Sequence, residues 1–159
     1  MVIGEISMSV APYVSSPEEV VRKMLDMAQL REGEVLFDLG CGDGRIVVMA
    51  ARDYSAKAFG VEIREDLAAV AREQLRRTNL QTKAEIILGS LFDVDLSRAD
   101  VVTLYLSKSG IDKLRPKLEK ELRPNSRVIS LDISITGWKP LEFSEKLKHI
   151  IYLYKVGLH

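Results

Sequence analysis

The feature that most constrains this chain is a glycine-rich loop that follows a short apolar run. The run at 35–37, Val-Leu-Phe, leads directly into Asp38-Leu39-Gly40-Cys41-Gly42-Asp43-Gly44, and apolar residues then recur with helical spacing from Ile46 to Ala51. A buried strand, a glycine turn and a helix in this order are typical of the first unit of a parallel α/β sheet. The loop of such a unit lies at the carboxyl edge of the sheet, where ligands bind.

The rest of the chain continues this alternation. Strands are expected at 57–63, 84–88, 101–106 and 128–133, with a helix around 67–75. Residues 141–148 and 150–156 predict an antiparallel hairpin. We therefore expect an α/β fold over residues 1–159: a single Rossmann-like domain with a mostly parallel sheet, a C-terminal antiparallel hairpin and flanking helices. Residues 1–11 are expected to be a flexible lead.

Two helices carry specific predictions about their ends. Ser16 is expected to cap the first helix, with Pro17 in its first position and Glu19 completing a capping box. The stretch 111–122 is helical in composition but contains Pro116, which lacks the N–H group and clashes with the preceding turn. We expect the helix to break at Pro116 or to begin there.

Composition excludes several classes of protein. Lysine plus arginine and aspartate plus glutamate number 23 each, so the net charge of zero argues against binding nucleic acid through bulk charge. The single cysteine, Cys41, forms no disulfide within the chain and suggests a reducing compartment. No signal peptide and no apolar run of about 20 residues are evident. We expect a cytoplasmic protein, with His149 and His159 at the surface and no metal site.

The charges of the glycine loop indicate its ligand. The glycines fall as G-x-G-x-G, with Asp38 before them and Asp43 among them. Two carboxylates would repel the pyrophosphate of a dinucleotide but suit a cationic ligand. S-adenosylmethionine (SAM) carries an ammonium and a sulfonium and no phosphate. Glu62, at the end of the second strand, can accept both ribose hydroxyls, a feature that would serve NAD equally well.

A second loop, 89–93, follows the third strand and would flank the adenine. Leu91 or Phe92 could pack on the ring, and Ser90 could hydrogen-bond its edge. Structural alternatives stay open for each feature: a tight turn for the glycines, a solvated strand end for Glu62 and an ordinary turn for 89–93. Cys41 is expected to fill a tight loop rather than to act as a nucleophile. The basic residues between 108 and 127 alternate with acids, which favours a solvated helix face over a surface for acidic protein or RNA.

The loop Asp38–Gly44 resembles motif I of class I SAM-dependent methyltransferases. Four segments are similar to the small archaeal protein-lysine methyltransferases, which are related to the mitochondrial enzymes that methylate the c-ring protein of ATP synthase and the adenine nucleotide translocase. The resemblance covers nearly the whole chain from Pro12. The four segments are 12–17 (PYVSSP), 38–46 (DLGCGDGRI), 114–119 (LRPKLE) and 137–140 (GWKP).

This resemblance implies a set of site residues. Tyr13 and Val14 would cover the cofactor and shape the access route for lysine, and Tyr105 with Leu106 would lie beside the sulfonium. Tyr13, Tyr105 and Trp138 are the catalytic candidates, as walls of a partly apolar channel that favours the neutral amine. Core packing is an equal alternative for Tyr105 and Trp138. The cofactor-binding set is Tyr13, Val14, Asp38, Gly40, Cys41, Gly42, Glu62, Ile63, Ser90, Leu91, Phe92 and Tyr105.

The expected function is therefore SAM-dependent N-methylation of exposed lysine side chains in proteins, by an archaeal enzyme that is a monomer or weak oligomer. An RNA or small-molecule methyltransferase is the first alternative. Against it, the fourth strand ends Leu104-Tyr105-Leu106-Ser107, without the Asn-Pro-Pro-Tyr type of motif that holds an exocyclic base amine. A non-catalytic module that binds SAM or a nucleotide is the second alternative.

Overall fold

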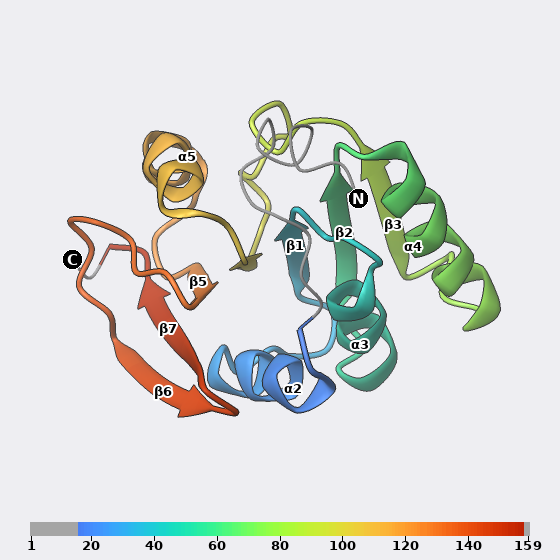
Figure 1. Ribbon diagram of the computed structural model, residues 1–159, viewed down its shortest axis with the longest axis horizontal. Helices are drawn as coiled ribbons and strands as arrows, with labels where there is room; N and C mark the ends of the chain where they lie inside the picture. Colours follow the sequence, from blue (N-terminus) through green and yellow to red (C-terminus); the bar gives the residue numbers. More distant parts are fainter. Residues whose placement is uncertain (1–15, 158–159) are drawn as a thin grey trace.

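The computed structural model describes residues 16–157, which form a seven-stranded sheet in the order β3-β2-β1-β4-β5-β7-β6 (Figure 1). The first five strands pair in parallel, whereas β7 pairs antiparallel with both β5 and β6. This confirms the α/β fold with a mostly parallel sheet and a terminal hairpin. The strands are β1 Val35–Leu39, β2 Lys57–Glu62, β3 Ala84–Leu88, β4 Val101–Leu104, β5 Arg127–Leu131, β6 Glu142–Lys146 and β7 His149–Lys155.

The strand order reverses at β1, which has β2 on one side and β4 on the other. Leu39, the last residue of β1, stands opposite Val61 of β2 and Leu104 of β4. The carboxyl ends of the three strands are therefore level with one another. In open α/β sheets, ligands bind outside the carboxyl edge at such a reversal point.

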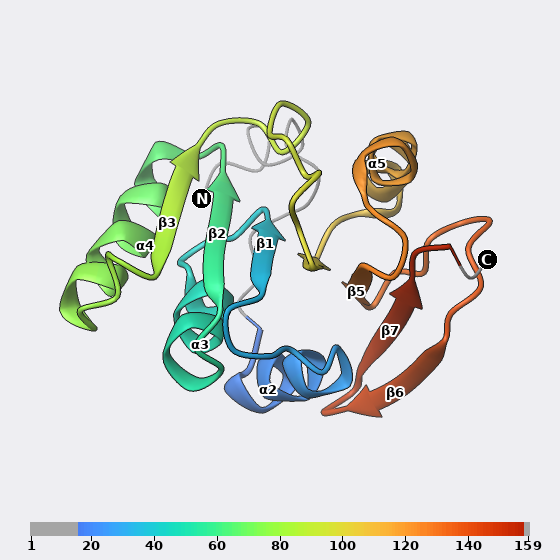
Figure 2. The ribbon, with the colours of Figure 1, turned by 180° about the vertical axis from the view of Figure 1, so that it is seen from behind.

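Helices cover both faces of the sheet. The helices α2 Glu18–Met27, α3 Arg45–Asp53 and α4 Glu65–Arg77 contribute to one core, and α5 Lys108–Glu121 contributes to the other. The apolar stripes of these helices supply the buried contacts, such as Met24 and Val47 in the first core and Leu114 in the second. Helix α5 stands apart from the other three helices in both ribbon views (Figures 1 and 2).

The start of α2 differs from the sequence prediction. Pro17 is the N-cap, with extended backbone (φ −60°, ψ 147°), and no side chain of residues 16–157 caps the helix. Ser16 lies one residue before the cap, is buried, and accepts a hydrogen bond at its carbonyl oxygen from Nη1 of Arg45 at 2.9 Å. The capping-box prediction is therefore wrong, because packing against the start of α3 decides where Ser16 lies.

The expected break at Pro116 is also wrong, since α5 runs without interruption from Lys108 to Glu121. Proline removes the hydrogen bond to the carbonyl four residues earlier, that of Asp112. Both Pro116 and Asp112 lie on the exposed side of the helix, so water can satisfy that carbonyl. The buried Ile111, Leu114 and Leu118 hold the opposite side against the sheet.

Strand ends explain which residues reach the edge of the sheet. β4 and β5 each end two residues earlier than predicted, which leaves Tyr105 and Asp132 in the loops just beyond them.

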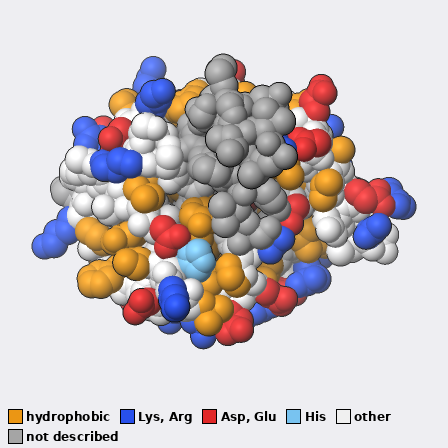
Figure 3. Space-filling view, in the orientation of Figure 1, with side chains coloured by type: hydrophobic (Ala, Val, Ile, Leu, Met, Phe, Trp, Pro, Cys, Tyr) orange, Lys and Arg blue, Asp and Glu red, His pale blue; other side chains and the backbone are white. Residues whose placement is uncertain are grey.

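The β6–β7 hairpin turns at Leu147 and Lys148, whose φ values of 49° and 67° match the two-residue turn that suits twisted strands. Apolar side chains gather on the lower left of Figure 3, where Figure 1 shows this hairpin. Phe143 of β6 is among the exposed large apolar residues. Within 16–157, no helix has the length and apolar character needed to cross a bilayer.

Candidate functional site

The glycine loop is tied to β2 by its backbone. The N–H groups of Gly40 and Cys41 both donate to the carbonyl oxygen of Val61, at 2.8 and 2.9 Å. Gly40 has a φ of +80°, a conformation that side chains disfavour, and Gly40 is exposed at the mouth of the loop. Gly44 serves a different purpose, because a Cβ there would lie 2.9 Å from the Cβ of Ala71. The last glycine of the motif therefore allows α3 to approach α4.

Cys41 packs inside the loop rather than facing a substrate. Its side chain is 6% exposed, and a Cβ on Gly60 would lie 2.7 Å from its sulfur. Burial, together with the negative charges of Asp38 and Glu62, raises the pKa of the thiol well above its usual range. This favours the interpretation of Cys41 as a filler of a tight loop. Its contact with a cofactor stays a prediction, and its backbone N–H is already used by Val61.

Asp38 is a buried carboxylate at the end of β1. Its Oδ1 accepts a hydrogen bond from the Thr103 hydroxyl at 2.8 Å, and the residue is 3% exposed. Burial raises the pKa of Asp38 to about 7, and the negative charges of Glu62 and Asp43 add to this rise. Among residues 16–157, no lysine or arginine forms an ion pair with it. A buried negative charge of this kind is stabilised by a cation from outside the chain.

Glu62 closes the loop from the neighbouring strand. Its Oε1 accepts the N–H of Gly42 at 2.8 Å, and its Oε2 accepts the N–H of Arg64 at 3.0 Å. These bonds orient the carboxylate, which is 7% exposed. A carboxylate has about four lone-pair positions, so both oxygens retain the capacity to accept ribose hydroxyls.

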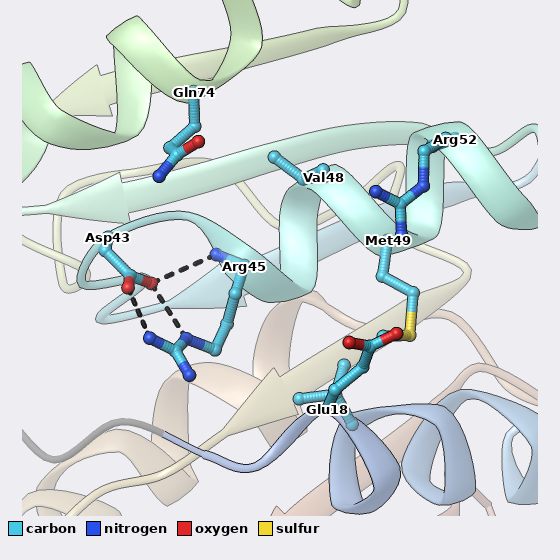
Figure 4. Close-up of a pocket in the computed structure, with 8 residues that line it drawn as sticks. Glu18, Asp43, Arg45, Val48, Met49, Arg52 and Gln74 are labelled. Carbon is cyan, nitrogen blue, oxygen red and sulfur yellow. Dashed lines mark hydrogen bonds and ion pairs between the residues drawn. The ribbon is translucent and has the colours of Figure 1, made fainter. Parts of the chain in front are cut away.

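Asp43 does not contribute a free negative charge, as the sequence argument assumed. Its carboxylate binds Nε and Nη2 of Arg45 at 3.1 and 2.6 Å, and also accepts the Arg45 backbone N–H (Figure 4). The pair borders a hollow of about 230 Å³ on the side of α2 and α3, whose lining includes neither Asp38 nor Glu62. The electrostatic case for a cationic ligand therefore rests chiefly on Asp38 and Glu62.

These side chains fit SAM on chemical grounds. Two buried carboxylates that have no lysine or arginine partner in the described part of the chain match a ligand that carries positive charge and hydroxyl donors. The exposed Gly40 leaves the backbone open to close approach. A pyrophosphate would meet these two carboxylates, neither of which forms an ion pair with a lysine or arginine of residues 16–157.

The predicted adenine contacts divide into exposed and buried residues. Ile63 and Phe92 are 57% and 37% exposed, near the carboxyl ends of β2 and β3, so they can present apolar surface to a ring. Leu91 is 7% exposed and belongs to the core on the α5 side. The Ser90 hydroxyl accepts the N–H of Phe92 at 3.1 Å, which shapes the turn. The adenine-binding roles of these residues remain predictions.

Three polar residues from separate parts of the chain meet beyond β4 and β5. Nδ1 of His149 lies 2.8 Å from Oδ2 of Asp132, and the rings of His149 and Tyr105 contact edge to face with centroids 6.2 Å apart. Burial, and then the Asp132 carboxylate, raises the pKa of Tyr105 above its usual value. Sequence reasoning assigned His149 to the surface and did not single out Asp132. Only the strand order brings them to Tyr105.

Comparison with known proteins identifies the family. Residues 38–142 match the sequence model of the ANTKMT methyltransferase domain. The chain belongs to this family. It is 42% identical over 153 residues to a protein-lysine N-methyltransferase of Saccharolobus islandicus, covering 93% of this chain and 95% of that protein. It is 31% identical to the adenine nucleotide translocase lysine N-methyltransferase of Mus musculus, covering 82% of this chain and 56% of that protein.

A solved structure has nearly the same sequence identity to this methyltransferase as the Saccharolobus protein. The RNA methyltransferase of Salinibacter ruber, in complex with S-adenosyl-L-homocysteine, superposes with a TM-score of 0.88 at 40% identity, covering 90% of this chain and 94% of that one. S-adenosyl-L-homocysteine is what SAM becomes after it gives up its methyl group. The comparison therefore agrees with the cofactor expected from the glycine loop, and the family and enzyme predictions are confirmed.

The remaining predicted residues of the methyltransferase lie elsewhere. Trp138 is 6% exposed, and its Nε1 donates to Glu119, near the end of α5, at 2.8 Å. It also packs on Tyr154, which stands opposite Val128 near the start of β5. This position suits core packing better than a channel at the carboxyl edge. Tyr13 and Val14 lie outside the described residues, as does His159.

The basic residues of α5 are largely compensated. Lys108, Arg115 and Lys117 form ion pairs one helical turn away, with Asp112, Glu119 and Glu121. This pattern favours a solvated helix face. Among residues 16–157, no cluster of His, Cys, Asp or Glu could hold a metal ion.

Proposed function

We propose that this methyltransferase transfers the methyl group of SAM to lysine side chains of proteins. The observation that carries the proposal is the 42% identity to a protein-lysine N-methyltransferase, which extends over 93% of this chain. The lysine N-methyltransferase of the adenine nucleotide translocase, which matches at lower identity, supports the same class of acceptor.

The proposed cofactor site uses the edge where β1, β2 and β4 end. Asp38 binds the cationic amino-acid end of SAM, Gly40 and Gly42 let the backbone approach it, and Glu62 accepts the ribose hydroxyls. Ile63, Ser90, Leu91 and Phe92 surround the adenine, and Tyr105 lies beside the sulfonium. Tyr13 and Val14 complete this set by family resemblance.

The chemistry requires alignment and a neutral amine. SAM, when bound, supplies an activated methyl group that already has a good leaving group. The acceptor lysine has a reference pKa of about 10.4 and must lose a proton before its nitrogen can attack. The chain therefore has to orient the amine, limit its hydration and remove that proton.

Methylation of RNA is the second candidate, because the Salinibacter structure of 40% identity is described as an RNA methyltransferase. Against RNA stand the zero net charge of the chain and the acid-paired lysines and arginines of α5. Proteins that bind RNA through its phosphates present uncompensated basic surface.

We also propose that the protein is archaeal and cytoplasmic. The source of the 42% identical relative supports an archaeal origin. The single cysteine, a buried free thiol, suits a reducing compartment.

The test supplies the purified protein with deuterated-methyl SAM and offers three acceptors in parallel: protein extract of Saccharolobus islandicus, its total RNA, and a small-molecule extract. Mass spectrometry then locates the label. We expect labelled methyl groups on lysine residues, and none with the Asp38→Asn variant. Label confined to RNA nucleosides or small molecules would overturn the proposal.

A further inference from the structure

Three side chains that converge at one edge suggest how the acceptor amine is held. Tyr105 follows β4, Asp132 follows β5, and His149 begins β7. β4 and β5 are parallel neighbours and β7 runs antiparallel beside β5, so these three chain positions meet at the carboxyl edge. The edge also carries Asp38 on β1, next to β4. The cluster therefore lies on the side of the strand-order reversal opposite to the ribose-binding Glu62.

Asp132 is held rigidly at this edge. Its Oδ1 accepts the N–H of Ile150 at 2.9 Å, and its own N–H donates to the Ile150 carbonyl at 2.6 Å. Its φ of +67° is uncommon for a residue with a side chain, although aspartate and asparagine tolerate it best. The backbone thus aims the second oxygen, Oδ2, at Nδ1 of His149.

This arrangement leaves one nitrogen of His149 available. When Nδ1 carries the proton and donates it to Asp132, Nε2 holds a lone pair and can accept a proton. No residue of 16–157 forms a hydrogen bond with Nε2. The side chain of His149 is 20% exposed and that of Asp132 is 31% exposed, so the pair is reachable from outside yet partly desolvated.

We propose that His149 accepts the proton of the acceptor lysine, that the Tyr105 hydroxyl orients the resulting amine, and that Asp132 is the positioning residue for both. This inference deepens the proposed function and rests on it. In the proton step, one N–H bond of the lysine ammonium breaks and a new N–H bond forms at Nε2 of His149. The imidazolium is paired with Asp132, and the amine nitrogen regains its lone pair. After turnover the proton leaves to water.

The charges around His149 come from each element that packs on it. Asp132 faces it from the end of β5, and Tyr105, a neutral phenol, from the end of β4. Lys146 of β6 stands opposite His149 and forms an ion pair with Glu19 of α2 at 3.6 Å. Lys148 precedes His149 in the chain. Asp132 is thus the charged group in contact with His149, and Lys146 is compensated by its own partner.

The experiment measures methyl transfer to an arrayed library of lysine-containing peptides. Peptides in which arginine replaces each lysine are the negative controls. His149→Asn keeps an amide that can donate to Asp132, and Asp132→Asn suits the positive φ. Tyr105→Phe keeps the ring contact. Tyr152→Phe is its matched control, because Tyr152 lies on β7 opposite Ser130 and its ring contacts Phe143 rather than His149. SAM affinity, measured by calorimetry, should stay within about threefold of wild type for the His149 and Asp132 variants.

We expect His149→Asn to lower kcat/KM by about 100-fold at pH 7.5, the usual contribution of a general base. The loss should shrink to less than about fivefold at pH 9.5, because the neutral fraction of a free lysine rises from about one in 800 to about one in nine. Tyr105→Phe should lower kcat, and Tyr152→Phe should leave turnover within about twofold. Nitrogen NMR of the folded protein should show neutral His149 protonated on Nδ1.

Distinct outcomes separate this inference from the proposed function. If wild type methylates lysine peptides but His149→Asn is impaired equally at both pH values, or not at all, the inference alone is overturned. The same holds if the neutral ring carries its proton on Nε2. If wild type methylates no lysine in any peptide or protein, the proposed function and the inference fall together.

Discussion

Replacing Asp38 by asparagine should stabilise the protein without ligand while weakening its binding of SAM. The pKa of Asp38 is raised from 3.8 to about 7, chiefly by burial. Between these two values the folded protein keeps a proton that the unfolded chain has released. The free energy of unfolding of wild type should therefore fall as the pH rises from about 4 to about 7, and level off above that.

The size of this effect follows from the interval between the two pKa values. One pKa unit corresponds to about 1.4 kcal/mol, so ionising Asp38 at pH 8 costs roughly 4 kcal/mol. Asparagine cannot ionise, and its oxygen can still accept the Thr103 hydroxyl. Its NH₂ group, if left without a partner, costs about 1–3 kcal/mol. We expect a net gain of about 1–3 kcal/mol at pH 8 and none at pH 4.5.

Urea unfolding of Asp38→Asn and wild type at pH 4.5 and pH 8 measures this difference. Asp53→Asn is the control of opposite sign. Arg52 and Arg22 lower the pKa of Asp53 from 3.8 to about 2, so its charge stabilises the fold fully above about pH 4, and the variant should lose stability at both pH values. In parallel, calorimetry should show Asp38→Asn binding SAM at least tenfold more weakly. If Asp38→Asn were less stable than wild type at pH 8, or bound SAM with unchanged affinity, Asp38 would not be a buried charge that a bound cation stabilises.

Three further predictions follow from other parts of the molecule. The affinity of wild type for SAM should decrease below pH 7, by up to tenfold per pH unit, because Asp38 must ionise to bind a cation. Calorimetry across pH 5–8 measures this dependence, and an affinity that does not change with pH would contradict it. Gly44→Ala should lower the free energy of unfolding by about 2–3 kcal/mol, because Gly44 has a φ of +86° and an added Cβ would clash with Ala71. Gly33 has a similar φ of +81° but open space around it, so Gly33→Ala should lower the free energy of unfolding by only about 1 kcal/mol in the same experiment. Trp138→Phe removes the hydrogen bond to Glu119 and should cost about 1–2 kcal/mol in urea unfolding, while a more than tenfold loss of turnover in the folded variant would instead support a channel role.

Much of the fold was predictable because its signals are local. The apolar run before Asp38 and the helical spacing after Gly44 indicated the first strand and α3 within a residue or two. The antiparallel hairpin was likewise expected from its two short strands. Predictions that depended on tertiary contacts were less successful. Pro116 was expected to break α5, but the exposed side of the helix can leave the carbonyl of Asp112 to water.

The candidate site shows the same division. Asp38, Gly40 and Glu62 could be predicted as cofactor-binding residues because a strand-loop-helix unit places such residues at known positions along the chain, and the structure brings them to one edge of the sheet. Asp43 was misjudged, since its neutralisation depends on the side-chain conformation of Arg45. Sequence spacing gives no indication of which carboxylate already has a basic partner.

The sequence by itself determined the alternation of strands and helices and the acidic, glycine-rich character of the cofactor loop, because both depend on residues close together in the chain. Only the tertiary structure decided that Tyr105, Asp132 and His149 meet. They come from three strands, and strand order and direction, set by long-range packing and hydrogen bonding, bring their ends to one edge. Tertiary structure also decided that Asp38 keeps its charge unpaired within the described chain, which makes it suited to a cationic cofactor.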